Sequence, residues 1–326
     1  MKRVLSGIQP SGQLHLGNYF GMMSRMIHYQ KENDLFAFIV NYHALTSIQN
    51  REILRENTFS AACDFLALGL DPEKSTFWIQ GDVPQVTELT WLLSNVVNVG
   101  LLQRSTSYKD KIAQGVASNM GLFSYPILMA ADILLFGSEK VPIGKDQKQH
   151  LELTRDLAGA FNRRFGVEYF KLPEPMIVKD VKRIMSLQDG ERKMSKSDES
   201  DLSRINLTDS PELILKKIKK AKTDSESFIS FDENRKEIYN LLNIFSATSN
   251  KTPQELAKEY ENLGNGKFKN DLAESLIEHL KPIQERLKQF EEDKSYIDKI
   301  LKSGSEKAQE IANKTKNEIF EIIGLK

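Results

Sequence analysis

The sequence predicts an α/β protein, with a parallel sheet in the first part of the chain and an all-α region after it. Two observations carry this prediction. Up to about residue 198, short apolar runs alternate with segments of helical spacing, which is typical of βαβ units. Beyond residue 198 the chain is rich in lysine and glutamate, and its apolar residues follow helical spacing. We therefore predict two domains, over residues 1–198 and 199–326.

The predicted elements follow in order along the chain. Strands are expected at residues 3–8, 35–40 and 76–80, followed by helices at residues 17–32, 51–70 and 84–99. Further helices are expected at residues 211–222, 236–246, 252–263, 271–290 and 305–323. This order predicts a Rossmann-like, doubly wound parallel sheet followed by a helical domain. Such sheets bind ligands beyond the carboxyl ends of their strands, so the loops there are the first candidates for a site.

Composition limits the location and the chemistry of the protein. The 326 residues are 40% hydrophobic and 28% charged, as in an ordinary globular protein. The chain has no run of 18 apolar residues and no signal-like N-terminus, so we expect a cytoplasmic protein with no membrane partner. The one cysteine, Cys63, cannot form an internal disulfide, and no Cys/His cluster has zinc-ligand spacing. No metal site on the protein is expected.

The balance of charge means that nucleic-acid binding would need a local basic patch. Lysine and arginine together number 45, and so do aspartate and glutamate. The best candidate is the lysine-rich stretch LKKIKKAK at residues 215–222, in the helical region. A lysine face that meets only solvent is the alternative interpretation.

A glycine-rich loop, GIQPSGQLHLGN at residues 7–18, joins the first expected strand to the first expected helix. Such a loop leaves room for a ligand against backbone N–H groups, and the N-terminus of a helix favours phosphate. The loop matches neither the GxGxxG pattern nor the closing Gly-Lys-Ser/Thr of a P-loop. His15 and Asn18 can both donate hydrogen bonds to phosphate or ribose oxygens. A tight connection that binds nothing is the alternative.

A second stretch, RKMSKS at residues 192–197, carries two lysines three residues apart, Lys193 and Lys196. By itself it is best interpreted as a solvated basic loop. Together with the glycine-rich loop it indicates phosphoryl or nucleotidyl transfer, because that chemistry depends mainly on positioning and on cationic stabilisation of phosphate charge.

These two stretches resemble the signature motifs of the class I aminoacyl-tRNA synthetases. The tetrapeptide HLGN at residues 15–18 is similar to the HIGH motif, and residues 193–197 match the KMSKS motif. Further segments resemble the bacterial tryptophanyl-tRNA synthetases in particular: GIQPSG (7–12), MAADIL (129–134), VPIGKDQ (141–147), LLNI (241–244) and PIQER (282–286). The resemblance extends over essentially the whole chain, with the motifs in the same order and spacing.

One expected helix face indicates an amino-acid pocket. Tyr125, Met129, Asp132 and Phe136 recur at helical spacing. An ordinary core stripe is the alternative, but Asp132 interrupts it, because a carboxylate on an apolar face is costly without a partner. An indole N–H only donates hydrogen bonds and is a suitable partner. The resemblance implies that Asp132 recognises the tryptophan side chain.

The resemblance also implies the other site residues. The tryptophan-binding positions are Leu5, His43, Tyr125, Met129, Asp132, Val141, Ile143 and Gln147. The ATP-binding positions are Gln9, Pro10, Ser11, Gly17, Asn18, Gly144, Lys145, Asp146, Ile184, Lys193, Met194, Ser195, Lys196 and Ser197. The catalytic phosphate contacts are Lys111, Lys193 and Lys196. For His43 taken alone, a purely structural histidine is the alternative.

The implied reaction has two steps and needs several partners. The carboxylate of tryptophan attacks the α-phosphate of ATP, and a ribose 2′-OH of tRNA(Trp) then takes the acyl group. Mg²⁺ should accompany ATP and be bound mainly through its phosphates. The family uses its helical domain for the anticodon, and the acceptor end reaches the active site of the partner subunit. A homodimer is therefore expected.

Four residues, at three places in the chain, depart from the common pattern of this family. Many relatives carry an aromatic residue in place of Leu5, Asp-Gln in place of Asn41-Tyr42, and glutamate in place of Lys145. These departures bear on the shape of the pocket and on inhibitor sensitivity rather than on the reaction.

Three other functions share part of this pattern. A tyrosyl-tRNA synthetase shares the architecture and a pocket aspartate. A small-molecule nucleotidyltransferase would not need the long helical domain. A non-catalytic RNA-binding paralogue would be expected to have lost one of the two signature motifs.

Overall fold

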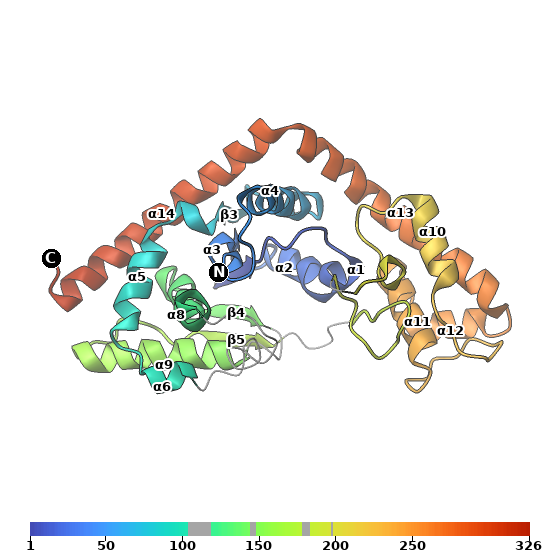
Figure 1. The fold of residues 1–326 in the computed structure, drawn as a ribbon, viewed down its shortest axis with the longest axis horizontal. Helices are drawn as coiled ribbons and strands as arrows, with labels where there is room; N and C mark the ends of the chain where they lie inside the picture. The colour runs from blue at the N-terminus through green and yellow to red at the C-terminus, as the bar shows by residue number, and fades with distance from the viewer. Residues whose placement is uncertain (104–118, 144–147, 178–182, 197) are drawn as a thin grey trace.

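The computed structural model describes residues 1–103, 119–143, 148–177, 183–196 and 198–326. Within them, one 5-stranded parallel sheet has the order β3-β2-β1-β4-β5. The strands are β1 (Arg3–Ile8), β2 (Asp34–Ile39), β3 (Ser75–Ile79), β4 (Lys140–Ile143) and β5 (Glu174–Ile177). Helices surround the sheet and make up the second half of the chain (Figure 1). The predicted α/β class with a Rossmann-like, doubly wound sheet is confirmed.

The strand order reverses at β1, and such a reversal opens the crevice in which these sheets bind ligands. From β1 the chain proceeds to β2 and β3 on one side, and to β4 and β5 on the other. The register pairs Ile8 with Ile39, and Ile39 with Ile79. The loops that follow these three strands therefore leave the sheet at one common edge.

Side chains on opposite faces of the sheet build two separate cores. On β2, for example, Leu35 belongs to one core and Phe36 to the other. Helix α4 (Arg51–Ala67) contributes to the first core, and helices α8 (Met120–Leu135) and α9 (Lys148–Phe165) contribute to the second. Because both faces are covered, the central strands are continuous apolar runs, and this made them predictable.

The remaining helices complete the two halves of the chain. In the first half they are α1 (Leu16–Asn18), α2 (Ser24–Tyr29), α3 (Asn41–Ala44), α5 (Gln85–Ser94) and α6 (Val99–Gln103). In the second half they are α10 (Pro211–Lys220), α11 (Lys236–Thr248), α12 (Pro253–Tyr260), α13 (Gly264–Glu292) and α14 (Lys294–Ile323). Every helix predicted for the second half is present. In the described part of the chain, no helix has the length and apolar character needed to cross a membrane.

The prediction of one continuous α-helix at residues 17–32 is wrong for its middle part. Between α1 and α2 the chain forms a π-helical turn, η1 (Tyr19–Met23). Tyr19 Oη lies 3.1 Å from Nε2 of His279 on α13, and the Phe20 ring packs against the same imidazole. A π-turn is a local irregularity that often marks a functional region, and here it follows directly on the glycine-rich loop.

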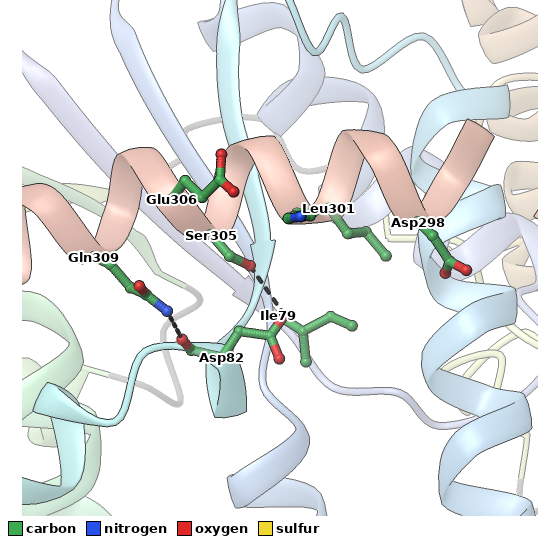
Figure 2. A pocket seen from close by; sticks show the side chains of 8 residues that line it. Ile79, Asp82, Asp298, Leu301, Ser305, Glu306 and Gln309 are labelled. Atoms are coloured by element: carbon green, nitrogen blue, oxygen red, sulfur yellow. Dashed lines mark hydrogen bonds between the residues drawn. The ribbon is translucent and has the colours of Figure 1, made fainter. Parts of the chain in front are cut away.

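Helix α14 returns from the helical half and lies along β3, the edge strand of the sheet (Figure 1). At their closest point the two backbones touch, because a Cβ added to Gly304 would lie 1.8 Å from the carbonyl oxygen of Phe77. Just beyond β3 comes the 3-10 turn η2 (Gln80–Asp82), and Ser305 Oγ donates to Asp82 Oδ2 at 3.0 Å (Figure 2). The helix thus covers an edge that would otherwise present unpaired backbone groups.

Gly304→Ala should lower the stability of the fold. The added methyl group would overlap the Phe77 carbonyl, so helix and strand must separate, at a cost of about 1–3 kcal/mol. The measurement is the urea midpoint of unfolding. Gly266→Ala in α13 is the matched control, because nothing lies within 4 Å of its added Cβ. A Gly304→Ala protein at least as stable as the Gly266→Ala protein would contradict the close approach.

Candidate active site

The two signature stretches, far apart in the sequence, touch in the structure. The ammonium group of Lys196 donates to the carbonyl oxygen of Gly12 at 2.8 Å, and to Oγ and the carbonyl oxygen of Ser11 at 3.0 and 3.2 Å. The loop that holds Ser11 and Gly12 follows β1, where the strand order reverses. A cation therefore lies beside the glycine-rich loop at the ligand-binding edge of the sheet.

The base of the lysine loop is held by backbone pairing and by one buried side chain. The N–H of Met194 donates to the carbonyl of Ile184 at 3.1 Å. Asn240 of α11, 2% exposed, accepts from the N–H of Met185 at 2.9 Å and donates to its carbonyl at 3.0 Å. This role of Asn240 was not predicted, although the residue directly precedes the LLNI segment.

His15 is buried where the glycine-rich loop enters α1. It is 2% exposed, and its backbone pairs with Asn206 in an antiparallel bridge. Its Nδ1 is buried and has no hydrogen-bond partner among the described residues. Gly17 makes room for the ring, because a Cβ there would lie 3.0 Å from Nδ1 and 3.3 Å from the Cβ of Met194.

Burial and nearby cations tune the charges of this loop pair. Burial, together with nearby Lys196, lowers the pKa of His15 to about 4, so the imidazole is neutral at pH 7. Burial lowers the pKa of Lys196 to about 8, and Asp64 opposes this shift. Burial in turn raises the pKa of Asp64 to about 7. The Lys196 ammonium is thus a partly desolvated cation, suited to a phosphate.

The predicted tryptophan-binding carboxylate is the centre of a buried polar cluster. Asp132 on α8 is 3% exposed. His43 Nε2 lies 2.9 Å from its Oδ2, and Gln80 Nε2 donates to Oδ1 and Oδ2 at 2.9 and 2.8 Å. Burial raises the pKa of Asp132, while the hydrogen bonds from His43 and Gln80 oppose the rise. The predicted partner of this carboxylate, an indole, would join a site that already has two donors.

The other predicted pocket residues surround this cluster. Tyr125 lies edge-on to the His43 ring at 6.4 Å, and its Oη is 3.0 Å from Nε2 of His150 on α9. Val141 and Ile143 are both buried on β4. Leu5 is buried in the same hydrophobic core as Val141 and Ile143, and the partly buried Met129 packs against this core.

Several predicted positions lie outside the described residues: Lys111, Gly144, Lys145, Asp146, Gln147 and Ser197. Of the remaining ATP positions, Gln9 and Ser11 are exposed beyond β1, and Pro10 and Met194 are buried. Asn18 accepts from the N–H of His15 at 3.2 Å through its side-chain oxygen.

Gln80 and His150 belong to the site but were not predicted as site residues. Both are buried polar residues, 1% and 5% exposed, next to the expected pocket, and burial of a polar side chain is not visible in the sequence.

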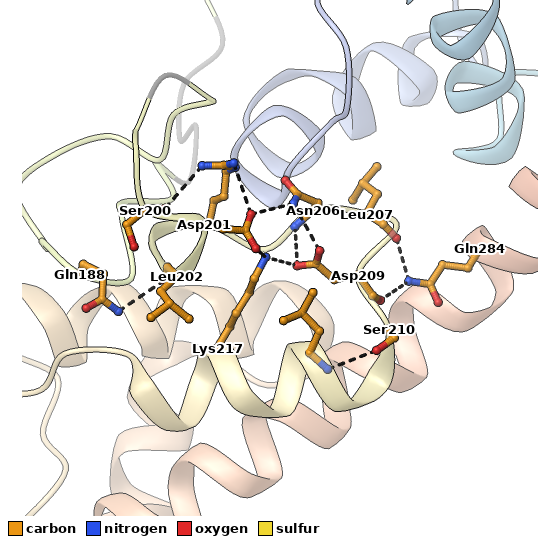
Figure 3. A network of polar contacts seen from close by, with 12 residues as sticks. Gln188, Ser200, Asp201, Leu202, Asn206, Leu207, Asp209, Ser210, Lys217 and Gln284 are labelled. Carbon is orange, nitrogen blue, oxygen red and sulfur yellow. Dashed lines mark hydrogen bonds and ion pairs between the residues drawn. The ribbon is translucent and has the colours of Figure 1, made fainter.

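The lysine-rich stretch at residues 215–222 is not one continuous basic surface. Lys217 is completely buried, and its Nζ pairs with Asp209 Oδ2 at 2.6 Å and with Asp201 Oδ2 at 2.8 Å (Figure 3). The same network holds Asn206, whose backbone pairs with His15. Including Lys217 in an RNA-binding face was wrong. Lys216, Lys219 and Lys220 are exposed and are still candidates.

Known proteins match this chain over its whole length. Residues 1–281 match the family described as tRNA synthetases class I (W and Y). The tryptophan–tRNA ligase of Rickettsia conorii is 48% identical over 325 residues, 99% of this chain and 98% of that protein. The ligase of Helicobacter pylori is 47% identical over 325 residues, 99% of each chain. A crystal structure of tryptophanyl-tRNA synthetase from Campylobacter jejuni, complexed with ADP and tryptophan, is 42% identical with a TM-score of 0.88 over 99% of each chain.

A doubly wound sheet whose two signature loops meet at the reversal of strand order is the catalytic core of a class I tRNA synthetase, and the chain belongs to this family, in its tryptophan and tyrosine group. Within that group it belongs with the bacterial tryptophan–tRNA ligases. The resemblance seen in the motifs is confirmed.

Proposed function

We infer that the chain is a tryptophan–tRNA ligase, which activates L-tryptophan with ATP and transfers it to tRNA(Trp), releasing AMP and diphosphate. Two neighbouring features support this conclusion. Lys196 contacts the glycine-rich loop that follows β1. The buried Asp132 cluster lies at the ends of the neighbouring strands. The first supplies a site for phosphate and the second a site for an indole.

The first step is formation of tryptophanyl-adenylate. The carboxylate of tryptophan is already ionised, so it attacks the α-phosphate of ATP without a protein nucleophile or base, and pyrophosphate leaves. The protein contributes positioning and stabilisation of phosphate charge. We assign this stabilisation to Lys196 and Lys193, with Lys111 as a further phosphate contact. We propose that neutral His15 donates a hydrogen bond from its ring N–H to a phosphate or ribose oxygen.

Mg²⁺ is proposed to enter with ATP and to be held through the phosphates. In the described ranges, no group of three His, Cys, Asp or Glu side chains is placed to bind a metal. The expectation for Mg²⁺ comes from its usual chemistry with nucleotides, in which the ion takes most of its ligands from the phosphates and from water. The ion would neutralise charge on the phosphates beside the lysine loop.

The tRNA is proposed to bind along the helical region, residues 199–326. The exposed lysines of α10, Lys216, Lys219 and Lys220, supply positive charge for its phosphates. In the second step the 2′-OH of the terminal ribose takes the tryptophanyl group from the adenylate. We locate the protein in the cytoplasm, where its tRNA substrate is used.

A homodimer is proposed, and an exposed tryptophan supports it. Trp91 on α5 is 70% exposed, and Val99 on α6 and Met120 on α8 are 58% and 73% exposed. Large apolar side chains left open in this way are typical of surfaces covered by another chain. The molar mass in solution tests the proposal, with Trp91→Glu as the variant that should shift the protein toward monomer.

The test of the function is ATP–pyrophosphate exchange with each standard amino acid in turn, followed by charging of tRNA. We expect exchange to depend on tryptophan. Exchange driven by tyrosine and not by tryptophan would favour the tyrosyl alternative, and no exchange with any amino acid would favour a non-catalytic RNA-binding protein.

Asp132→Ala should weaken use of tryptophan without affecting ATP. Loss of a hydrogen bond to a charged group costs about 1.5–3 kcal/mol, which is roughly a 10- to 150-fold decrease in kcat/KM for tryptophan. The KM for ATP should stay within about twofold. The measurement is exchange at varied tryptophan and ATP. An unchanged kcat/KM for tryptophan would remove Asp132 from the pocket.

A further inference from the structure

Gln80 is the residue that touches both oxygens of the pocket carboxylate. It is 1% exposed and begins the turn η2, directly after β3. Its Nε2 donates to Asp132 Oδ1 at 2.9 Å and to Oδ2 at 2.8 Å. Among the described residues, the other side chain bonded to this carboxylate is His43.

The orientation of the Gln80 amide is fixed from its other end. The N–H of Tyr42 lies 3.0 Å from Gln80 Oε1. A backbone N–H can only donate, so the amide oxygen must face it and the NH₂ group must face Asp132. A flipped amide would lose the Tyr42 bond and place its oxygen against a carboxylate.

The turn that carries Gln80 is itself locked to the end of β2. The N–H of Gly81 donates to Asn41 Oδ1 at 2.9 Å, and a Cβ on Gly81 would lie only 3.0 Å from Asn41 Nδ2. Asn41 and Tyr42 are two of the positions at which this chain departs from its family's common pattern. Asn41 holds the η2 turn through its side chain, and Tyr42 holds it through its backbone N–H and through Oη, which donates to the Gly81 carbonyl at 3.4 Å.

Burial disfavours the ionised form of the Asp132 carboxylate, and the hydrogen bonds to it oppose this effect. Burial favours the protonated form of Asp132, and a protonated carboxyl would carry a hydrogen of its own. An indole N–H only donates, so it needs an acceptor oxygen on the protein. Hydrogen-bond donors stabilise the ionised carboxylate, which can then accept a hydrogen bond from the indole N–H.

We propose that Gln80 is a specificity-determining positioning residue: it orients the Asp132 carboxylate as a hydrogen-bond acceptor, so that the pocket selects a side chain with an indole N–H. This inference rests on the proposed function, because it concerns the same tryptophan pocket. A site built to accept a substrate N–H rejects an analogue that lacks it, since the buried acceptor is then left unfilled.

The test compares tryptophan with β-(benzothiophen-3-yl)alanine, in which sulfur replaces the indole N–H. The wild-type enzyme should favour tryptophan in kcat/KM for exchange. In Gln80→Met, which keeps the size but removes the amide, this preference should fall about tenfold. The loss should appear in the KM for tryptophan, while the KM for ATP stays within about twofold.

The matched control is Gln85→Met. Gln85 is also buried, lies on α5 and donates to Asn313 Oδ1 at 2.7 Å, away from Asp132. Its variant should keep the wild-type preference for tryptophan. A purely structural role for Gln80 would lower kcat/KM equally for both substrates and leave the preference unchanged, and this result would overturn the proposal.

A second variant covers the case in which Gln80→Met does not fold. In Gln80→Glu two carboxyl groups face each other and His43, and they cannot both ionise easily, so they share a proton at low pH. The shared proton imitates the amide N–H. The KM for tryptophan should therefore rise with pH in this variant beyond any rise in the wild type. Equal pH profiles would contradict the proposal. Absence of tryptophan-dependent exchange in the wild type would instead refute the proposed function.

Discussion

Lys196→Ala should reduce kcat for tryptophan-dependent ATP–pyrophosphate exchange by about 10³-fold, while tryptophan still binds. Removal of one preorganised donor to developing charge costs about 10²–10³ in kcat, and cationic groups on transferring phosphates contribute up to about 10⁵. In the free enzyme the Lys196 ammonium already lies on the glycine-rich loop, so it needs little movement to reach a phosphate bound there. Steady-state exchange kinetics and tryptophan binding measured by calorimetry separate the two effects.

A pH profile sharpens this prediction. The pKa of Lys196 in the free enzyme is about 8, so the cation is present below that pH and is lost above it. Hence kcat/KM for ATP should decrease as the pH rises through about 8. Lys196→Arg retains the charge and should remove this decrease. Lys171→Ala, at an exposed lysine, is the control and should behave as the wild type. A Lys196→Ala enzyme with normal kcat and weakened tryptophan binding would contradict the assigned role.

Lys217→Met should lower the free energy of unfolding by about 3–5 kcal/mol, the usual cost of leaving one member of a buried ion pair without its partner. The carboxylate of Asp209 would be left buried among groups that bond to it as an anion. Denaturant unfolding measures the effect. Because the network also holds Asn206 against His15, the KM for ATP should rise in the same variant.

Two further variants show whether the loss of stability in Lys217→Met comes from a buried charge that has lost its partner. Lys216→Met changes the exposed neighbour and should alter stability by less than about 0.5 kcal/mol. The double variant Lys217→Met with Asp209→Asn removes both charges and should be more stable than Lys217→Met alone. Similar, small effects at positions 216 and 217 would mean that Lys217 is solvated.

The sequence predicted the sheet well where strands are buried on both faces. The run LFAFIV at residues 35–40 is such a strand, and β2 lies within one residue of it. Strand β5 was not predicted. It contains Pro175 and lies at the edge of the sheet, where proline is tolerated and the apolar signal is weak. The π-turn at residues 19–23 was also missed, because its contacts come from His279, far along the chain.

The site was predictable where motifs are local and was missed where partners are distant. HLGN and KMSKS can be recognised from short segments of sequence, and the contact of Lys196 with the glycine-rich loop follows from the fold. Gln80 gave no such signal, because its importance comes from Asp132, 52 residues further along the chain. Lys217 was misplaced for the same reason: among neighbouring lysines, only Asp201 and Asp209 distinguish it.

The long-range contacts of the η2 turn affect the order in which the protein folds during its synthesis. Gln80 at its start completes the tryptophan pocket, while Asp82 at its end is bonded to Ser305 and Gln309, 223 and 227 residues later. Contacts between such distant residues form late in folding, and chains emerge from the ribosome N-terminus first. A nascent chain can therefore pair its early strands long before the turn beside the pocket gains its support. We expect ribosome-bound chains that have not yet exposed residue 309 to bind tryptophan more weakly than the released protein.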